Sequence, residues 1–149
     1  MAGHAIFDLK SLLLAKHAQH VVLVHFPIAL YITGSAFDLT GQWTKRRDLL
    51  NVGWYNLLVA AISSVPVIAT GFLAWQFQLE GQHMKGILLL HLVFGCVSAS
   101  MMWITAWVHY RAWRCACSLP RYRIAIEIVA VVIIGLTSHL GGFLSGVNS

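Results

Sequence analysis

Four long apolar segments constrain this chain more than any other feature. They cover about residues 20–39, 52–77, 87–110 and 123–144, and each is long enough to cross a hydrocarbon core, which takes about 20 helical residues. Backbone groups in lipid have no water to bond, so segments of this length must be helical. Because only short joints separate them, we predict an all-α fold: an integral membrane, antiparallel four-helix bundle that forms a single domain over residues 1–149.

The composition supports a membrane protein and argues against a nucleic-acid partner. Hydrophobic residues make up 58% of the chain and charged residues 10%. Soluble proteins have roughly 45–50% and about 25%, respectively. The net charge of +5 is spread over separate joints and does not form one basic patch. The expected partner is therefore the lipid bilayer, and we expect no nucleic acid.

The segment before the first span, residues 1–19, combines leucines with Lys10 and Lys16. This mixture predicts a short N-terminal helix lying at the membrane interface. The segment has no basic leader followed by a small-residue cleavage site, so we expect it to be retained in the mature protein.

The basic residues are divided unevenly between the two sides of the bundle. Seven of the ten Lys and Arg residues lie in or beside the joints after the first and third spans. The positive-inside rule then predicts that both termini are outside, in the periplasm, with the protein in a bacterial inner membrane. The seven residues are Lys45, Arg46, Arg47, Arg111, Arg114, Arg121 and Arg123.

The three cysteines do not indicate a disulfide framework. Cys96 lies inside an apolar run, and Cys115 and Cys117 form a CxC pair in a joint. Structural zinc sites use four ligands, so we expect two ordinary loop thiols. Metal binding by the pair is the alternative.

Histidines gather near the side of the membrane that carries the termini. His25, His91 and His139 lie on three different spans, at depths that differ by about one helical turn. His20 lies just above His25 on the first span. A neutral imidazole in lipid needs a partner, so a histidine at this depth usually faces the protein interior.

Small residues accompany these histidines, because Gly95 follows His91 by one turn and Gly135 precedes His139 by one turn. Small side chains leave room for a flat group against a helix. Two imidazoles from facing helices also complete the iron of a b-type haem in a bundle. We therefore predict a non-covalent haem b held by two of His25, His91 and His139. The residues expected around the haem are His25, His91, His139, His20, Gly95 and Gly135. Copper or another metal, or a polar proton-handling cluster, are the alternatives.

Three further polar residues lie near span ends on the opposite side: Asp38, His109 and Glu127. Asp38 is close to the basic joint after the first span, and Glu127 follows Arg123 by one turn. We expect interfacial ion pairs with these basic neighbours. A quinone or proton site is the alternative.

Several short motifs follow one another along the spans. Residues 20–30 read HVVLVHFPIAL, residues 69–71 read ATG, the third span begins near His91, and residues 138–142 read SHLGG. With these motifs the chain resembles an uncharacterised family of small bacterial four-helix membrane proteins that has an HPxxVHFPIAL-like signature. Val21 departs from the proline that the family has after the first histidine. The layout is similar to that of the four-helix b-type cytochromes that serve as membrane subunits of oxidoreductases.

The resemblance and the histidines together lead to an expected function. We expect a haem-binding subunit that passes electrons between membrane quinol and a periplasmic cytochrome or a larger redox complex, with quinone as a possible second cofactor. The chain has little mass outside the membrane, so a subunit of an oxidoreductase is favoured over an enzyme acting alone. The alternatives are a non-redox membrane anchor or assembly subunit, and a copper-binding membrane protein.

Overall fold

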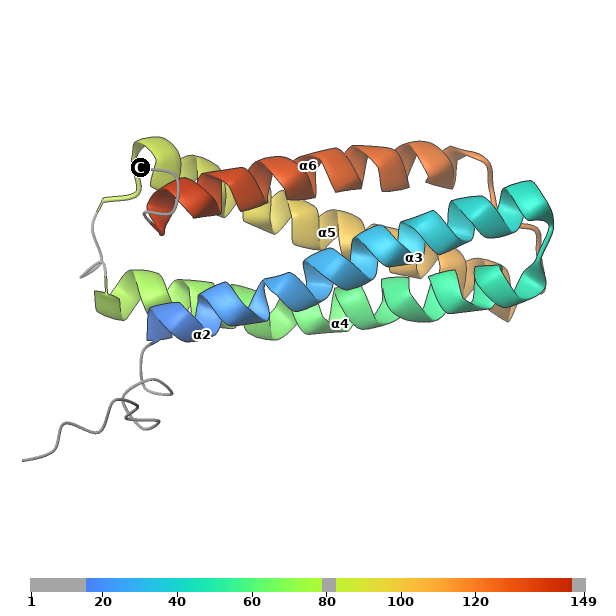
Figure 1. Cartoon of the computed structure of the whole chain (residues 1–149), viewed down its shortest axis with the longest axis horizontal. Helices are drawn as coiled ribbons and strands as arrows, with labels where there is room; N and C mark the ends of the chain where they lie inside the picture. The colour runs from blue at the N-terminus through green and yellow to red at the C-terminus, as the bar shows by residue number, and fades with distance from the viewer. Residues whose placement is uncertain (1–15, 79–82, 146–149) are drawn as a thin grey trace, which may run out of the picture.

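The computed structural model describes residues 16–78 and 83–145, and every regular element in that part of the chain is a helix (Figure 1). The helices are α2 (Lys16–Leu23), α3 (His25–Thr44), α4 (Arg47–Gln78), α5 (Gly86–Arg114) and α6 (Tyr122–Leu144). Four stretches are long and apolar enough to cross a membrane: Gln19–Thr44, Arg47–Gln76, Gly86–Arg114 and Tyr122–Leu144. The predicted all-α membrane fold with four spanning helices is confirmed. Of the interfacial segment expected over residues 1–19, residues 1–15 lie outside the described part, and α2 begins at Lys16.

Helices extend beyond the predicted spans on the side of the basic joints. α3 continues past Leu39 to Thr44, and α4 begins at Arg47 instead of Val52. The connection is short because Lys45 has a left-handed backbone (φ 57°), and its N–H bonds carbonyl groups in the last turn of α3. Hydropathy underestimates these helices because polar residues at their ends can lie in the headgroup region, outside the hydrocarbon core.

The sequence pattern predicts a continuous first helix, and the structure has an interruption at Val24, between α2 and α3. The backbone of Val24 stays helical (φ −60°, ψ −28°), and its N–H donates to the carbonyl oxygen of His20. Pro27 explains the break, because it has no N–H and its ring excludes the carbonyl of Leu23, four residues earlier. A proline is tolerated within the first turn of the helix that follows. As a result, His20 lies on α2 and His25 begins α3.

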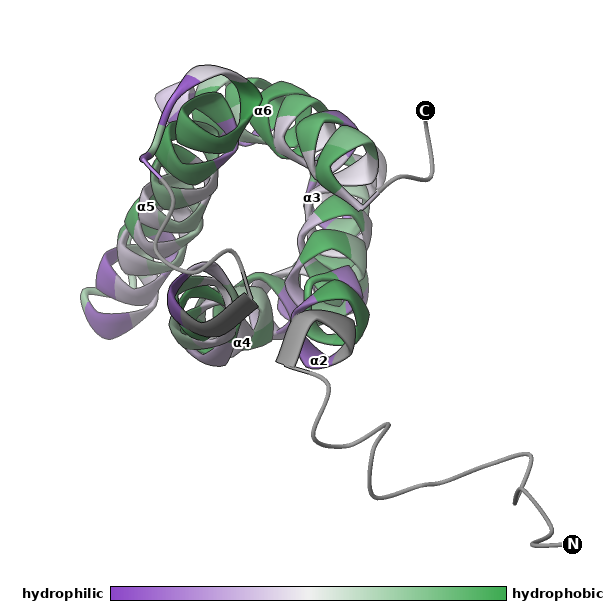
Figure 2. Cartoon of the chain, turned by 90° about the vertical axis from the view of Figure 1, so that its left-hand side faces the viewer, coloured by the Kyte–Doolittle hydropathy of each residue, from purple (hydrophilic) through white to green (hydrophobic). Residues whose placement is uncertain are grey.

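The spans form an antiparallel ring in which neighbours along the chain pack together (Figure 2). α3 packs against α4, α4 against α5, α5 against α6, and α6 against α3. The start of α2 and the end of α6 lie at one end of the bundle, which we call the terminal end (Figure 1). The α3–α4 and α5–α6 joints lie at the other end, which we call the basic end.

The interior contains mainly small and polar side chains, whereas large apolar side chains face outward. Ala60, Ala61 and Ala130 have no exposed surface, and Phe26 is 63% exposed. Small residues let membrane helices approach closely where no hydrophobic effect drives them together. Across this interior, Tyr31 Oη on α3 lies 2.8 Å from Thr105 Oγ1 on α5, within hydrogen-bonding distance.

Glycines set the close approach of α3 and α4. A Cβ atom on Gly53 would lie 2.9 Å from the backbone nitrogen of Asp38, and one on Gly41 would lie 2.8 Å from the backbone nitrogen of Leu50. Backbone atoms cannot move aside as a flexible side chain can, so a larger residue would separate the two helices. This contact fixes the position of Asp38 inside the bundle.

Candidate functional site

Two histidines from different helices meet near the terminal end. The ring centroids of His20, on α2, and His91, on α5, are 6.4 Å apart, and the ring planes are nearly perpendicular at 89°. Both side chains are half-buried. We call these two residues the terminal histidine pair.

One ring nitrogen of each histidine is held by a neighbouring helix. Nδ1 of His20 lies 3.1 Å from the carbonyl oxygen of Val67 and 3.3 Å from Thr70 Oγ1, both on α4. Nδ1 of His91 lies 3.1 Å from the carbonyl oxygen of Thr137 on α6. A carbonyl oxygen can only accept, so Nδ1–H is the donor and a neutral ring keeps its lone pair on Nε2. Metal-binding histidines are commonly oriented by such a bond from their second nitrogen.

Each ring of the pair also lies against a glycine. A Cβ atom on Gly71 of α4 would be 3.0 Å from Cε1 of His20, and one on Gly141 of α6 would be 3.1 Å from Cε1 of His91. Even an alanine at these positions would therefore press on the imidazole. The two glycines belong to the ATG and SHLGG motifs of the sequence, so the motifs contain a signal for the pair that the spacing of the histidines alone does not give.

The other two histidines predicted as ligands lie elsewhere. His25 is exposed, and its Nδ1 donates to the carbonyl oxygen of Val21, 2.7 Å away in the preceding turn. His139 is exposed as well, and its ring stands edge-on to Phe143 with the centroids 4.9 Å apart. His139 is two residues from both Thr137 and Gly141, which face α5, and residues two apart do not share a helix face. Of the predicted histidines, the structure brings together His91 and His20.

The two glycines predicted beside a haem are not required by close packing within the chain. A Cβ atom on Gly95 would be 3.9 Å from a methyl carbon of Thr137, an ordinary contact. A Cβ atom on Gly135 would meet no atom within 4 Å. Their role beside a cofactor stays a prediction.

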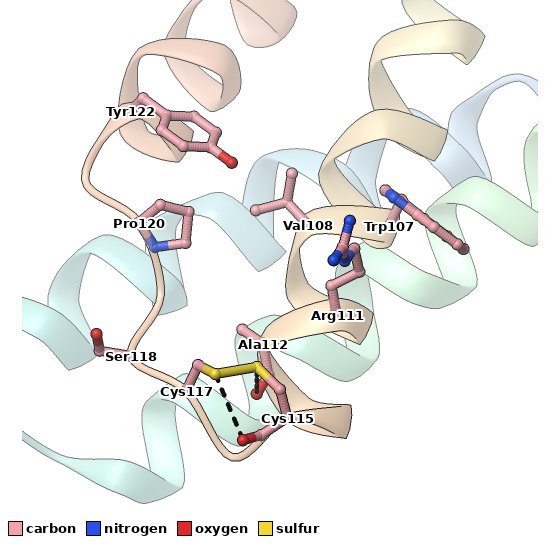
Figure 3. A pocket seen from close by; sticks show the side chains of 9 residues that line it. All are labelled: Trp107, Val108, Arg111, Ala112, Cys115, Cys117, Ser118, Pro120 and Tyr122. Atoms are coloured by element: carbon pink, nitrogen blue, oxygen red, sulfur yellow. Dashed lines mark hydrogen bonds between the residues drawn. A yellow bond between two sulfur atoms is a disulfide. The ribbon is translucent and has the colours of Figure 1, made fainter.

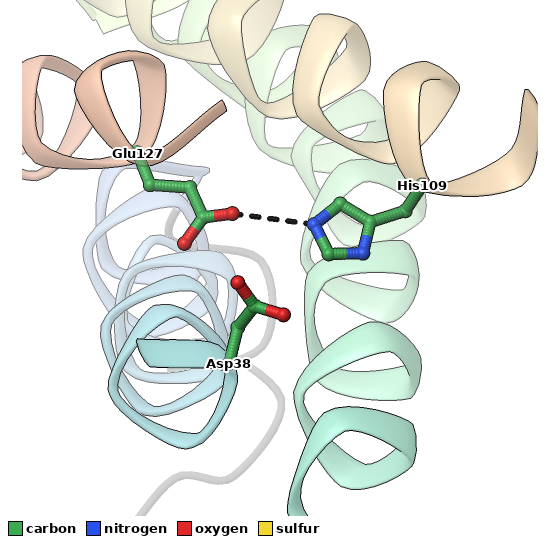
Figure 4. Close-up of side chains that lie close together, drawn as sticks. All are labelled: Asp38, His109 and Glu127. Carbon is green, nitrogen blue, oxygen red and sulfur yellow. Dashed lines mark hydrogen bonds and ion pairs between the residues drawn. The ribbon is translucent and has the colours of Figure 1, made fainter. Parts of the chain in front are cut away.

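A second group of polar side chains lies deep in the bundle toward the basic end. Asp38 and Glu127 are 0% exposed, Arg123 is 1% exposed and His109 is 4% exposed. Figure 4 shows Asp38, His109 and Glu127 converging from three helices, α3, α5 and α6. We call Asp38, His109, Arg123 and Glu127 the buried charged cluster.

Ion pairs and hydrogen bonds connect the members of this cluster. Nε and Nη2 of Arg123 donate to Oδ2 of Asp38 at 3.0 and 2.7 Å. Nε2 of His109 lies 3.2 Å from Oε1 of Glu127, and Arg123 Nε lies 3.9 Å from that same oxygen. The indole ring of Trp54, on α4, stacks on His109 with a centroid distance of 5.8 Å and an interplanar angle of 1°.

The ion pair expected between Glu127 and Arg123 is present, whereas the partner expected for Asp38 and the interfacial location of the pairs are corrected. Asp38 pairs with Arg123, which is distant in the sequence, instead of with the basic joint that follows α3, and the pair is buried. Arg123 therefore does not contribute an exposed charge to the basic end. The exposed basic residues there are Lys45, Arg46, Arg47, Arg111, Arg114 and Arg121.

Two oxygen atoms of the cluster, Oδ1 of Asp38 and Oε2 of Glu127, are buried with no hydrogen-bond partner in the part of the chain that the structure describes. One potential ligand atom each from Asp38, His109 and Glu127 lies within 4.8 Å of the others. An unsatisfied buried acceptor costs about 1–3 kcal/mol. These two oxygens therefore indicate a position where a bound species would be stabilising.

The CxC pair lies at the basic end, where Cys115 and Cys117 form a disulfide (Figure 3). Their Cα atoms are 5.2 Å apart, within the range that a disulfide requires. The expectation of two loop thiols is therefore corrected. The two cysteines border a cavity of about 350 Å³ that is also lined by Trp107, Val108, Arg111, Ala112, Ser118, Pro120 and Tyr122.

Comparison with known proteins places the chain in a family. No curated protein and no solved structure matches it. A family model described as "Predicted membrane protein (DUF2231)" matches residues 16–147, a range that contains all five described helices. With four helices suited to crossing a bilayer, the chain belongs to this family of multi-pass membrane proteins, DUF2231.

Proposed function

We propose that the protein binds a b-type haem between His20 and His91 and transfers electrons as a membrane subunit. The spacing of the terminal histidine pair carries this proposal. Two imidazole nitrogens about 2.0–2.1 Å from one metal ion, on opposite sides of it, place the ring centroids roughly 6 Å apart. The two rings are separated by 6.4 Å.

The hydrogen bonds of the pair also suit metal binding. Because Nδ1 of each ring donates to a backbone carbonyl, a neutral ring carries its lone pair on Nε2, the nitrogen that would bind a metal. Nε2 of His91 has no hydrogen-bond partner among the described residues. The α4 and α6 backbones thus hold both rings in one tautomer and restrict their rotation before a metal arrives.

The number of protein ligands favours haem over a bare ion. Among the described residues, only Asp38, His109 and Glu127 form a group of three potential ligands, and they belong to the buried charged cluster. A bare zinc ion at the histidine pair would lack the four ligands it usually has. A haem brings its own four nitrogens, requires two axial ligands and supplies one-electron chemistry at its iron. Copper is the second candidate, because imidazole is also a copper ligand.

The distribution of exposed basic residues indicates the side of the membrane on which this electron transfer would take place. Six exposed basic residues lie at the basic end, whereas Lys85 is exposed at the terminal end. By the positive-inside rule, the basic end faces the cytoplasm, and the terminal end with both termini faces the periplasm of a bacterial inner membrane. The histidine pair would then exchange electrons between membrane quinol and a periplasmic carrier or a larger redox complex.

The Cys115–Cys117 disulfide favours the opposite orientation, because disulfides persist mainly in oxidising compartments. Single-cysteine reporters in a cysteine-free background decide between the two. An impermeant thiol reagent added to intact cells should label His83→Cys, an exposed position at the terminal end, and leave Ser118→Cys at the basic end unlabelled. Labelling of Ser118→Cys alone would reverse the orientation.

The visible absorption spectrum of the purified protein, reconstituted with haem, tests the cofactor. We expect reduced-state bands of a low-spin bis-histidine haem in the wild type. His20→Ala and His91→Ala should each remove these bands, and His83→Ala, exposed at the same end, should retain them. A wild type that takes up no haem, or bands that survive both substitutions, would reject the proposal. Stoichiometric copper without haem would favour the second candidate.

A further inference from the structure

The buried charged cluster contains one more negative charge than positive charge. Asp38 and Glu127 each carry a carboxyl group, and Arg123 supplies one fixed cation. With both carboxyl groups ionised and His109 neutral, one negative charge is left uncompensated inside the membrane. Burying an uncompensated charge in a medium of low dielectric constant is costly, so a bound positive species would be stabilising.

Arg123 compensates Asp38 more than Glu127. Two of its nitrogens bond the same oxygen of Asp38, at 3.0 and 2.7 Å, whereas the nearest approach to Glu127 is 3.9 Å. His109 also contacts Glu127, 3.2 Å away. The remaining negative charge therefore resides mainly on Glu127.

The two unsatisfied oxygens belong to the two carboxyl groups that point toward one another (Figure 4). A single hydrogen on Oε2 of Glu127, directed at Oδ1 of Asp38, would give both atoms a partner. Two carboxyl groups that share a site do not both ionise easily, because like charges repel at short distance. One proton thus removes the excess charge and satisfies both oxygens.

A divalent cation fits the cluster less well. It would leave the site with a net positive charge beside the Arg123 guanidinium, which already occupies Oδ2 of Asp38. A proton makes the cluster neutral with Arg123 in place. Charge balance therefore selects a proton, although three potential ligand atoms lie within 4.8 Å of one another.

We propose that Glu127 and Asp38 form a buried proton-binding site that holds one proton between their carboxyl groups, with His109 as the group through which that proton exchanges. In the exchange step, the N–H bond at Nε2 of a protonated His109 breaks and an O–H bond forms at Oε1 of Glu127. Rotation of the Glu127 carboxyl group then turns this hydrogen toward Asp38. The proton comes from water and enters by protonating His109.

The groups that face this site come from every neighbouring helix. Asp38 and Tyr31 belong to α3, His109 to α5, and Arg123 and Glu127 to α6. α4 contributes Trp54, which stacks on His109 and does not titrate. The site is at the opposite end of the bundle from the terminal histidine pair and does not depend on a haem there.

Infrared spectroscopy of the full-length protein in nanodiscs at neutral pH tests the site. We expect one protonated-carboxyl C=O band per chain that shifts in D₂O. The band should shift when glutamate carries a ¹³C-labelled side-chain carboxyl and stay in place when aspartate does. It should be lost in Glu127→Gln, whose amide resembles the protonated acid in shape, and retained in Glu80→Gln and Asp48→Asn.

The exchange role of His109 has a separate readout. In His109→Gln the band should persist, while exchange of the carboxyl hydrogen for deuterium should slow by about a hundredfold. This factor is the lower end of what a positioned acid–base group contributes to a rate. Unchanged exchange would remove His109 from the route.

Three results would overturn the site itself. They are no protonated-carboxyl band in the wild type, a band that ¹³C-glutamate does not shift, and stoichiometric Zn²⁺ or Mn²⁺ binding that depends on Glu127. The ¹³C-labelling experiment needs no substitution, so it tests whether the protonated carboxyl group belongs to a glutamate even if Glu127→Gln does not fold. Because none of these measurements involves haem, their failure and the failure of the proposed haem site are distinguishable.

Discussion

The terminal histidine pair and the buried charged cluster lie in one bundle but are held by different forces. His20 and His91 are half-buried and are held by the backbone carbonyls of α4 and α6, with a glycine against each ring. Asp38 and Arg123 are fully buried and compensate one another across α3 and α6. The first site depends on local shape, and the second depends on charge balance. A substitution should therefore affect folding most at the cluster and cofactor binding most at the pair.

The largest effect on stability is expected from breaking the Asp38–Arg123 ion pair. Asp38→Ala removes the carboxylate that bonds two nitrogens of Arg123 and leaves Glu127, 3.9 Å away, beside the buried guanidinium. Removing one partner of a buried ion pair typically costs about 3–5 kcal/mol. Unfolding of the purified protein by denaturant in detergent micelles measures this loss. Asp48→Ala, an exposed carboxylate at the same end, is the matched control and should change stability little.

The double variant Asp38→Leu with Arg123→Met sharpens this prediction. Apolar side chains of similar size can replace a buried ion pair at little or no cost, so the double variant should recover most of the stability that Asp38→Ala loses. If it is as unstable as Asp38→Ala, then the ion pair does not dominate the stability of this region. Charge balance would then be the wrong description of the cluster.

A smaller effect is expected from adding one methyl group beside each histidine. Gly71→Ala and Gly141→Ala should displace the rings of His20 and His91, because the new Cβ would lie 3.0–3.1 Å from Cε1. Overpacking of this kind costs about 1–3 kcal/mol. Haem bound per folded protein should fall in both variants.

Gly135→Ala is the control for these two variants. Its Cβ would meet no atom within 4 Å, so the rings of His20 and His91 should keep their positions, while helix propensity improves by up to about 1 kcal/mol. If Gly71→Ala and Gly141→Ala bind as much haem per folded protein as the wild type, the rings tolerate the added methyl group. The description of the pair as a site set by shape would then fail.

The four spans could be predicted from the sequence because hydrophobicity and length alone determine which segments cross a bilayer. The contacts inside the bundle could not be predicted in the same way. Asp38 and Arg123 are 85 residues apart, and nothing in the local pattern of either indicates the other. In the sequence, Arg123 cannot be distinguished from the other basic residues at the joint between the third and fourth spans.

The pairing of His20 with His91 depends on the course of the first span, which the sequence indicates only in part. Pro27 is visible in the sequence and accounts for the helix break at Val24, beyond which His25 lies on α3 while His20 stays on α2. Depth in the membrane is therefore a poor guide to which histidine meets His91. The side of the helix on which each residue lies decides it, and His20 lies on the side that contacts α4.

The smallest effects are expected at His25 and His139, and these variants test the pair most directly. Both side chains are exposed, and Nδ1 of His25 donates to the carbonyl oxygen of Val21 in the preceding turn. His25→Ala and His139→Ala should each change the free energy of unfolding by no more than about 0.5 kcal/mol, as is usual for surface positions. The haem bands per folded protein should equal those of the wild type, because neither ring approaches His91 as His20 does. If either substitution removes the bands from folded protein, that histidine is an axial ligand, and the helices must then move from this arrangement when haem binds.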